Sequence, residues 1–76
     1  MSDPDALQWQ PMPQSSNVAR AAYDGAAREL IVEFSDGSQY AYGGTTENDL
    51  FLLVNSPSPG SYVFRNLKRF PARKLG

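Results

Sequence analysis

Residues 29–34 alternate apolar and polar side chains, and this alternation predicts a β-strand with one buried face. The apolar residues that would share this face are Leu30, Val32 and Phe34. Glu29 and Glu33 fall on the opposite face and mark it as largely exposed to solvent. The segment therefore predicts a strand that contributes to a core on one side only.

Two further strands are predicted beside it, at residues 18–23 and 38–42. The first is followed by a turn at Asp24-Gly25, and the second is preceded by Asp36-Gly37, which is a strong hairpin signal. Short strands joined by such turns pair with their sequence neighbours. The pattern predicts an antiparallel three-stranded β-meander.

The length of the second hairpin loop decides which face Tyr40 and Tyr42 occupy. A two-residue turn would place both tyrosines on the acidic face. A three-residue loop, Ser35-Asp36-Gly37, with a left-handed glycine and a bulge, pairs Val32 with Tyr40 and Leu30 with Tyr42. We expect the bulge register, since it collects the apolar area on one face and a one-residue slip would reverse every side chain. Both rings are then mostly buried, with their hydroxyls at the rim.

A short helix is predicted after the third strand. Thr46 with Asp49 forms a capping-box pattern, and the helix should stop at Asn55. Its expected apolar face is Leu50, Phe51, Leu53 and Val54. Because so short a helix is marginal alone, it must pack on the sheet.

The two ends of the chain show no clear periodicity. Residues 1–14 contain three prolines and are expected to form an extended arm, followed by a single domain at residues 15–76. Residues 56–60 are expected to be a rigid proline-containing loop. Residues 61–76 form a basic C-terminal segment without a regular pattern. The predicted class is α+β: the meander, one helix packed on it and this segment.

The composition argues against an enzyme. The chain has 76 residues with no cysteine and no histidine, which removes disulfides and metal sites built from these residues. The carboxylates are expected on turns, on an exposed strand face and at a helix start, where no pair shares a pocket. We expect no catalytic residue, metal, cofactor or small-molecule substrate. The longest apolar run, residues 50–54, is too short for a membrane span, and a cytoplasmic location is expected.

Charge is distributed unevenly along the chain. Residues 1–60 hold all eight acidic residues and two of the seven basic ones, whereas residues 61–76 hold five basic residues and no acidic one. Such a segment either binds an anion such as nucleic acid or pairs with the acidic part of its own chain or of a neighbouring subunit, and both interpretations stay open. The candidate nucleic-acid or anion site consists of Arg65, Lys68, Arg69, Arg73 and Lys74, with the aromatic residues Tyr62 and Phe70.

Trp9 is the only large apolar residue of the expected arm. It either folds back on the domain or anchors a partner, because tryptophan is enriched at binding hot spots. A small core, this arm and exposed strand edges are also typical of an assembly subunit. Protein–protein assembly, including a homo-oligomer, is therefore the alternative to nucleic-acid binding.

The order of several landmarks resembles one known family, the KTSC domain. They are Ser15-Ser16-Asn17, Tyr23-Asp24, Phe34, Gly37, Tyr40-Ala41-Tyr42, Ser58, Gly60 and Tyr62. The basic ending is also similar, so the resemblance covers residues 12–75. Phe64 departs from it, since the pattern has an asparagine there, as do the added Pro57 and Pro59.

The resemblance carries two expectations about function. This domain occurs at the C-terminus of some lysyl-tRNA synthetases, which implies RNA binding. It also occurs as a small stand-alone protein of bacteria and phages, which implies a virion accessory protein, such as a capsid decoration or cement protein, as an alternative located in the virion. We therefore expect a small non-enzymatic binding module.

Overall fold

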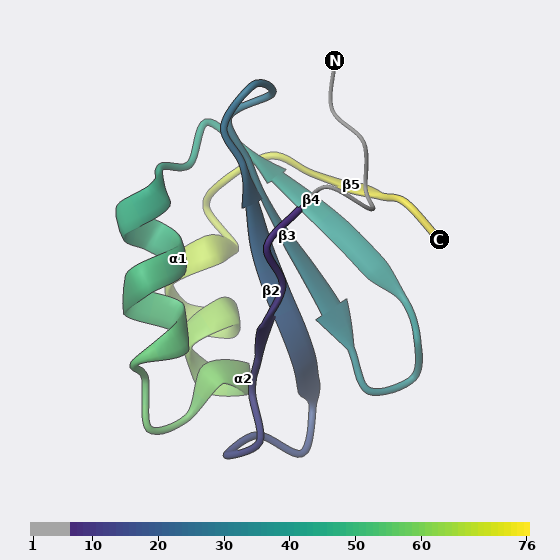
Figure 1. The fold of residues 1–76 in the computed structure, drawn as a ribbon, viewed down its shortest axis with the longest axis vertical. Coiled ribbons are helices and arrows are strands. Elements are labelled where there is room, and N and C mark those ends of the chain that lie inside the picture. Colours follow the sequence, from purple (N-terminus) through teal and green to yellow (C-terminus); the bar gives the residue numbers. More distant parts are fainter. Residues whose placement is uncertain (1–6) are drawn as a thin grey trace.

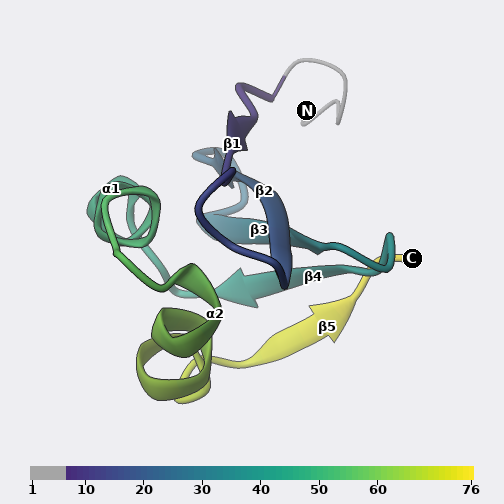
Figure 2. The same cartoon turned by 90° about the horizontal axis from the view of Figure 1, so that it is seen from below.

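The computed structural model describes residues 7–76, so the first six residues of the expected arm lie outside the described part. It is an α+β structure in which helices cover one face of a five-stranded antiparallel sheet (Figures 1 and 2). The elements are β1 (Gln10–Pro11), β2 (Val18–Asp24), β3 (Glu29–Phe34), β4 (Gln39–Gly43), α1 (Glu47–Val54), α2 (Pro59–Tyr62), the π-helical segment η2 (Val63–Leu67) and β5 (Ala72–Lys74). The strand order in the sheet follows the sequence order.

The predicted β3–β4 register is confirmed. Leu30 pairs with Tyr42 and Val32 pairs with Tyr40. In the loop, the Phe34 N–H donates to the Ser38 carbonyl at 2.8 Å, and the Gly37 N–H donates to the Phe34 carbonyl at 2.9 Å. Gly37 has a φ of 90°, as the left-handed bulge position requires. The apolar side chains of both strands consequently share the face beneath the helices.

The three-stranded sheet was an underestimate, because a short strand is added at each edge. β1 lies within the proline-containing arm and pairs Gln10 with Ala21 and Pro11 with Arg20. Two residues are too few to show an alternation in the sequence, and Pro11 tolerates an edge position. The residue after this strand, Met12, is buried in the core. The arm is thus joined to the sheet over residues 10–12.

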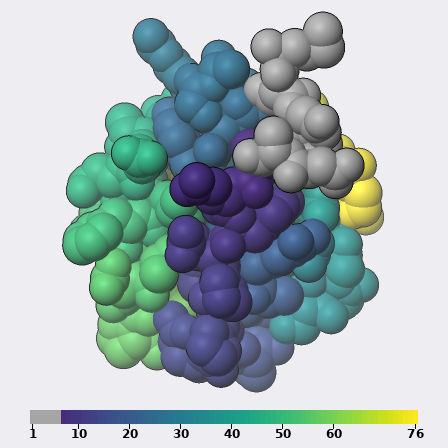
Figure 3. All heavy atoms as spheres, in the orientation of Figure 1, coloured from purple at the N-terminus to yellow at the C-terminus, as the bar shows by residue number. Residues whose placement is uncertain are grey.

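At the other edge, β5 forms from residues that the sequence marks only as basic. Ala72, Arg73 and Lys74 pair with Tyr42, Ala41 and Tyr40 of β4. All three residues are exposed, so the sequence shows no alternation of buried and exposed positions that would predict this strand. In the space-filling view the C-terminal segment reaches the surface at one edge, and the first described residues, in purple, lie on the face toward the viewer (Figure 3).

Helix α1 begins with the expected capping box, in which the Thr46 N–H donates to Asp49 Oδ2 at 2.7 Å. Leu53 is buried, and Leu50 and Val54 pack against the core. Phe51 was wrongly placed on the apolar face: it is 63% exposed, because it lies outside the stripe formed by positions 50, 53 and 54.

Residues 56–60 are not all loop, which corrects a second expectation. Pro59 is the first residue of α2, a position where the missing N–H of proline costs no helical hydrogen bond. The helix continues into η2, and Pro59, Val63 and Leu67 are buried. The basic segment therefore begins as a helix that closes the core. None of the helices in residues 7–76 is long and apolar enough to cross a membrane.

Candidate functional site

A groove of about 710 Å³ opens on the helix-covered side of the sheet. One wall comes from the sheet, through Phe34, Tyr40 and Tyr42, and the other from α2 and η2. The remaining lining residues are Asn17, Ser35, Asp36, Ser38, Gly60, Val63, Phe64, Lys68, Phe70 and Ala72. The groove thus joins residues from both halves of the chain.

The sheet wall is aromatic. The rings of Phe34 and Tyr40 meet edge to face, with centroids 5.8 Å apart and planes at 80°. Tyr42 is also buried. This burial raises the pKa of its hydroxyl, and electrostatic repulsion from the Tyr40 hydroxyl adds a smaller increase. Tyr42 is therefore mainly a structural residue, whereas Tyr40 is half-buried and presents part of its ring to the groove.

The helical wall presents Gly60, Phe64 and Lys68 at intervals of four residues. Phe64 is 72% exposed, an unusual position for a large apolar ring. The Lys68 ammonium lies 5.2 Å from the centre of this ring, a cation–π distance. A π-helical turn carries Phe64, and such turns recur at functional sites. This wall therefore offers an exposed aromatic surface beside a positive charge.

Phe70 lies at the end of the helical segment and also lines the groove. Its ring is half-buried against the core, and the Arg69 guanidinium lies 5.1 Å from the ring centre. Arg69 thus brings a second cation next to a groove-lining aromatic residue.

The polar part of the groove lies where the loop that precedes β2 meets the β3–β4 hairpin. The Ser35 N–H donates to the Asn17 carbonyl at 2.8 Å, which ties the two loops together. The Asp36 carboxylate accepts hydrogen bonds from the hydroxyl and the N–H of Ser38 at 2.6 and 2.9 Å. These bonds, with a smaller contribution from Lys74, lower the pKa of Asp36. Asp36 is thus held as an ionised acceptor.

The five predicted cations do not form one patch. Lys68 lines the groove, and Lys74 pairs with Tyr40 in the sheet, which places it on the groove side of β5. Arg65 and Arg69 are exposed on and just after η2. Within residues 7–76, none of these four forms an ion pair with a carboxylate. With respect to the described residues, they remain available to an anionic ligand.

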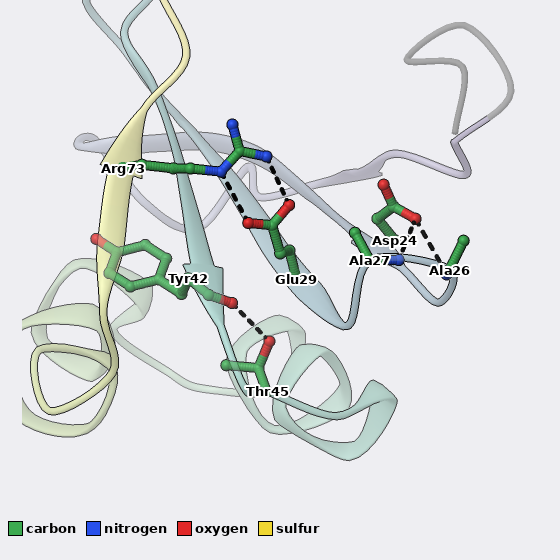
Figure 4. A network of polar contacts seen from close by, with 7 residues as sticks. All are labelled: Asp24, Ala26, Ala27, Glu29, Tyr42, Thr45 and Arg73. Carbon is green, nitrogen blue, oxygen red and sulfur yellow. Dashed lines mark hydrogen bonds and ion pairs between the residues drawn. The ribbon is translucent and has the colours of Figure 1, made fainter. Parts of the chain in front are cut away.

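Arg73 is the exception, since it lies on the opposite face of the sheet. Its guanidinium donates two hydrogen bonds to the Glu29 carboxylate, at 2.8 and 2.9 Å (Figure 4). The hydrogen bonds from Arg73 lower the pKa of Glu29. For this residue, the structure shows the self-pairing that the charge distribution left open.

Two predicted site residues lie outside the groove and pack on the protein itself: Tyr62 of the candidate nucleic-acid site and Trp9, the candidate partner anchor. Tyr62 does not line the groove but packs against the core, and burial raises the pKa of its hydroxyl. Trp9 is half-buried under the Arg20 guanidinium, which lies 4.0 Å from its ring centre. Arg20 also pairs with Glu33 at 3.1 Å. In this arrangement Trp9 folds back on the outer face of the sheet.

Sequence reasoning missed most of the groove, although one signal pointed to it. Five landmarks that carried the family resemblance line this groove: Asn17, Phe34, Tyr40, Tyr42 and Gly60. They are spread over more than forty positions in the sequence. Had these landmarks been placed on one surface, the resemblance would have indicated the site.

Comparison with known proteins agrees with these landmarks. The family model of the KTSC domain matches residues 14–70. A crystal structure of a KTSC domain protein from Yersinia pestis is 30% identical, with a TM-score of 0.82, and the match covers 93% of this chain and 100% of that one. No curated protein matches the chain. The chain, with its aromatic groove between sheet and helix, belongs to the KTSC domain family.

Proposed function

We propose that this chain is a non-enzymatic module that binds single-stranded nucleic acid in the groove. The observation that carries the proposal is the exposed Phe64 ring beside Lys68, opposite Tyr40. Single-stranded nucleic acids are bound by aromatic surfaces for the bases and cations for the phosphates. The groove supplies both.

The charges around the groove support a strand that runs along it. Lys68 is on the wall, Arg69 lies against Phe70, and Lys74 lies close enough to Asp36 to influence its pKa. Arg65 is exposed on the same helical segment. Because these cations have no carboxylate partner in the described residues, binding phosphates would not require breaking an ion pair.

The single carboxylate among the groove-lining residues also supports binding rather than catalysis. Asp36 is engaged by Ser38, and its lowered pKa keeps it ionised near neutral pH. A general acid or base needs a pKa close to the working pH.

A module that contacts RNA would fit a cytoplasmic location and the synthetase context that the resemblance implies.

A fluorescence anisotropy titration with single-stranded RNA and DNA tests the proposal. Binding should weaken steeply between about 50 mM and about 200 mM salt, since phosphate contacts release counterions. The matched double-stranded oligonucleotides should bind more weakly, because their paired bases cannot stack on Phe64. If no single strand binds at tens of micromolar protein in low salt, the proposal is wrong.

The outer side of α1 favours a second candidate function, protein–protein assembly. Phe51 and Leu52 are adjacent and exposed, at 63% and 44%. Two adjacent exposed apolar side chains can form part of a contact surface, and a virion accessory protein would use such a surface. Light scattering tests self-association: a dimer or larger species that Phe51→Ser converts to a monomer would support it. A strict monomer in the original chain would exclude the homo-oligomer.

A further inference from the structure

We infer that Asn17 reads the edge of a single base held in the groove, and that adenine is the base it prefers. This inference rests on the proposed function and adds a sequence preference to it. Stacking on Phe64 or Tyr40 accepts any base, so discrimination requires a polar side chain that offers a donor and an acceptor on separate atoms. Asn17 is the groove-lining residue that meets this requirement.

The position of the Asn17 side chain depends on a glycine. A Cβ atom at Gly60 would lie 3.2 Å from Asn17 Nδ2 and 3.5 Å from Asn17 Cβ. The first distance is tighter than most Cβ contacts and the second is an ordinary van der Waals contact, so an alanine at position 60 would require the amide to shift by a few tenths of an ångström. The absence of a side chain at Gly60 therefore lets the amide lie against α2, at the groove.

The backbone of Asn17 is held on both sides. Its N–H donates to Ser15 Oγ at 3.2 Å, and its carbonyl accepts the Ser35 N–H at 2.8 Å. The Ser35 hydroxyl in turn donates to the Ser16 carbonyl at 2.7 Å. These bonds connect the loop before β2 to the β3–β4 hairpin. The amide is therefore presented from a rigid support, which lowers the entropic cost of binding.

The amide itself makes no hydrogen bond within residues 7–76, although its backbone is fully engaged. The hydroxyls around it are in use, since Ser35 bonds to Ser16 and Ser38 bonds to Asp36. An exposed amide in a groove thus keeps one donor and one acceptor available to a ligand. The hydrogen bonds that shape this end of the groove involve neither the donor nor the acceptor of this amide.

An amide recognises a base that offers a donor next to an acceptor. On the edge that carries N7, adenine is the base that does so, through its amino group and N7, and asparagine binds this pair through two hydrogen bonds. Adenine also has two rings, so it stacks over a larger area between the walls that Phe64 and Tyr40 provide. Lys68, on the helical wall, is then placed for the adjoining phosphate.

The test uses uridine-rich RNA oligonucleotides that differ only in one central base: A, C, G or U, with the DNA counterparts as a second arm. The full chain should bind the adenine oligonucleotide about five- to a hundredfold more tightly than the others. Asn17→Ala should bring all four affinities to within about twofold of one another. Asn17→Asp replaces the donor by an acceptor and should shift the preference to guanine, whose edge carries two adjacent donors.

Two further variants separate base reading from other effects. Gly60→Ala should reduce the adenine preference while Asn17 is still present, because the added Cβ requires the amide to shift by a few tenths of an ångström. Asn48→Asp is the matched control for the added charge, since Asn48 is exposed on α1 and outside the groove. It should leave the order of the four bases unchanged. Thermal melting of each variant checks that it is folded.

The outcomes distinguish this inference from the proposed function. If all four oligonucleotides bind equally, or if Asn17→Asp changes all affinities by the same factor, base reading by Asn17 is wrong and groove binding stands. If no oligonucleotide binds at low salt, both are wrong. If Asn17→Ala removes the preference and Asn17→Asp redirects it to guanine, the assignment is correct.

Discussion

Arg73 and Glu29 are separated by 44 positions in the sequence and are joined by two hydrogen bonds of 2.8 and 2.9 Å (Figure 4). The Glu29 side chain is 14% exposed and that of Arg73 is 65% exposed. This pair connects β5 to β3 across β4, on the face opposite the groove. It therefore divides the basic segment into one cation with a structural role and four that are free of such pairing within residues 7–76.

The pH dependence of stability should reflect the two glutamates of the outer face. Hydrogen bonds from Arg73 and Arg20 lower the pKa of Glu29 and Glu33 below the ordinary value of 4.5. The unfolded chain then binds protons more readily than the folded one, so stability is present above about pH 4.5 and falls as the pH drops below it. Urea unfolding between about pH 5 and pH 3 measures this loss. Arg73→Gln should make the fall shallower, and an unchanged profile would contradict the role of the pair.

Phe64→Ala should weaken binding of single-stranded oligonucleotides without destabilising the fold. The ring is 72% exposed, so its removal leaves no cavity, whereas loss of a stacked base costs about 1–3 kcal/mol of binding free energy. Anisotropy titration and thermal melting measure the two effects separately. Phe51→Ala is the matched control, because Phe51 is 63% exposed on α1 and outside the groove. Equal losses in both variants would argue against stacking in the groove.

Replacement of Arg65, Lys68 and Arg69 by glutamine should reduce the salt dependence of binding. Each lost phosphate contact lowers the slope of log affinity against log salt by about 0.7 for a single strand, so three contacts would lower it by about 2. The fold should persist, since these cations make no ion pair in the described residues. Arg28→Gln, an exposed change in the β2–β3 turn and outside the groove, should leave the slope intact. A triple variant with an unchanged slope would show that the phosphates lie elsewhere.

Gly37→Ala should destabilise the protein by about 1–3 kcal/mol through the backbone alone. Gly37 has a φ of 90°, and nothing lies within 4 Å of a Cβ placed there. The cost thus comes from the left-handed conformation and not from a clash. Gly25→Ala is a suitable comparison, because it lies in the other hairpin turn without a positive φ. Chemical unfolding of both variants measures the difference, and equal stabilities would refute the bulge as the reason for glycine.

Leu67→Ala should cost about 2–5 kcal/mol of the free energy of unfolding, as truncations of fully buried leucines do. Leu67 is completely buried at the end of η2. A domain of this size has little stability to lose, so much of the variant is expected to be unfolded at 37 °C or below. Circular dichroism follows the change. A variant with the original melting temperature would mean that η2 is not part of the core.

The central hairpin could be predicted from sequence because local and global preferences agree there. Alternation placed Leu30 and Val32 on one face, and the need to bury apolar area selected the register with Tyr40 and Tyr42. The capping box of Thr46 and Asp49 was likewise a local signal. In each case the residues that decide the structure are close together in the chain.

The rest depended on contacts between distant residues. β5 is exposed and only three residues long, so its strand conformation comes from pairing with β4. Pro57 and Pro59 suggested a loop, although Pro59 at the first helical position is compatible with a helix. At the site, Lys68 and Phe70 of the predicted basic and aromatic segment line the groove. Asn17 and Phe34 join them only in the folded chain.

The exposed edge strand has a further consequence, for the dynamics of the groove. β2, β3 and β4 are connected by short hairpins, whereas β5 reaches β4 only after both helices and contributes no residue to the buried core. Local opening of a protein begins at such segments. Hydrogen exchange should therefore be fastest at the amides that join β5 to β4. Because Phe70 and Ala72 line the groove, this opening would widen the groove while the core stays intact. Under the proposed function, single-stranded nucleic acids of different bulk could then enter it.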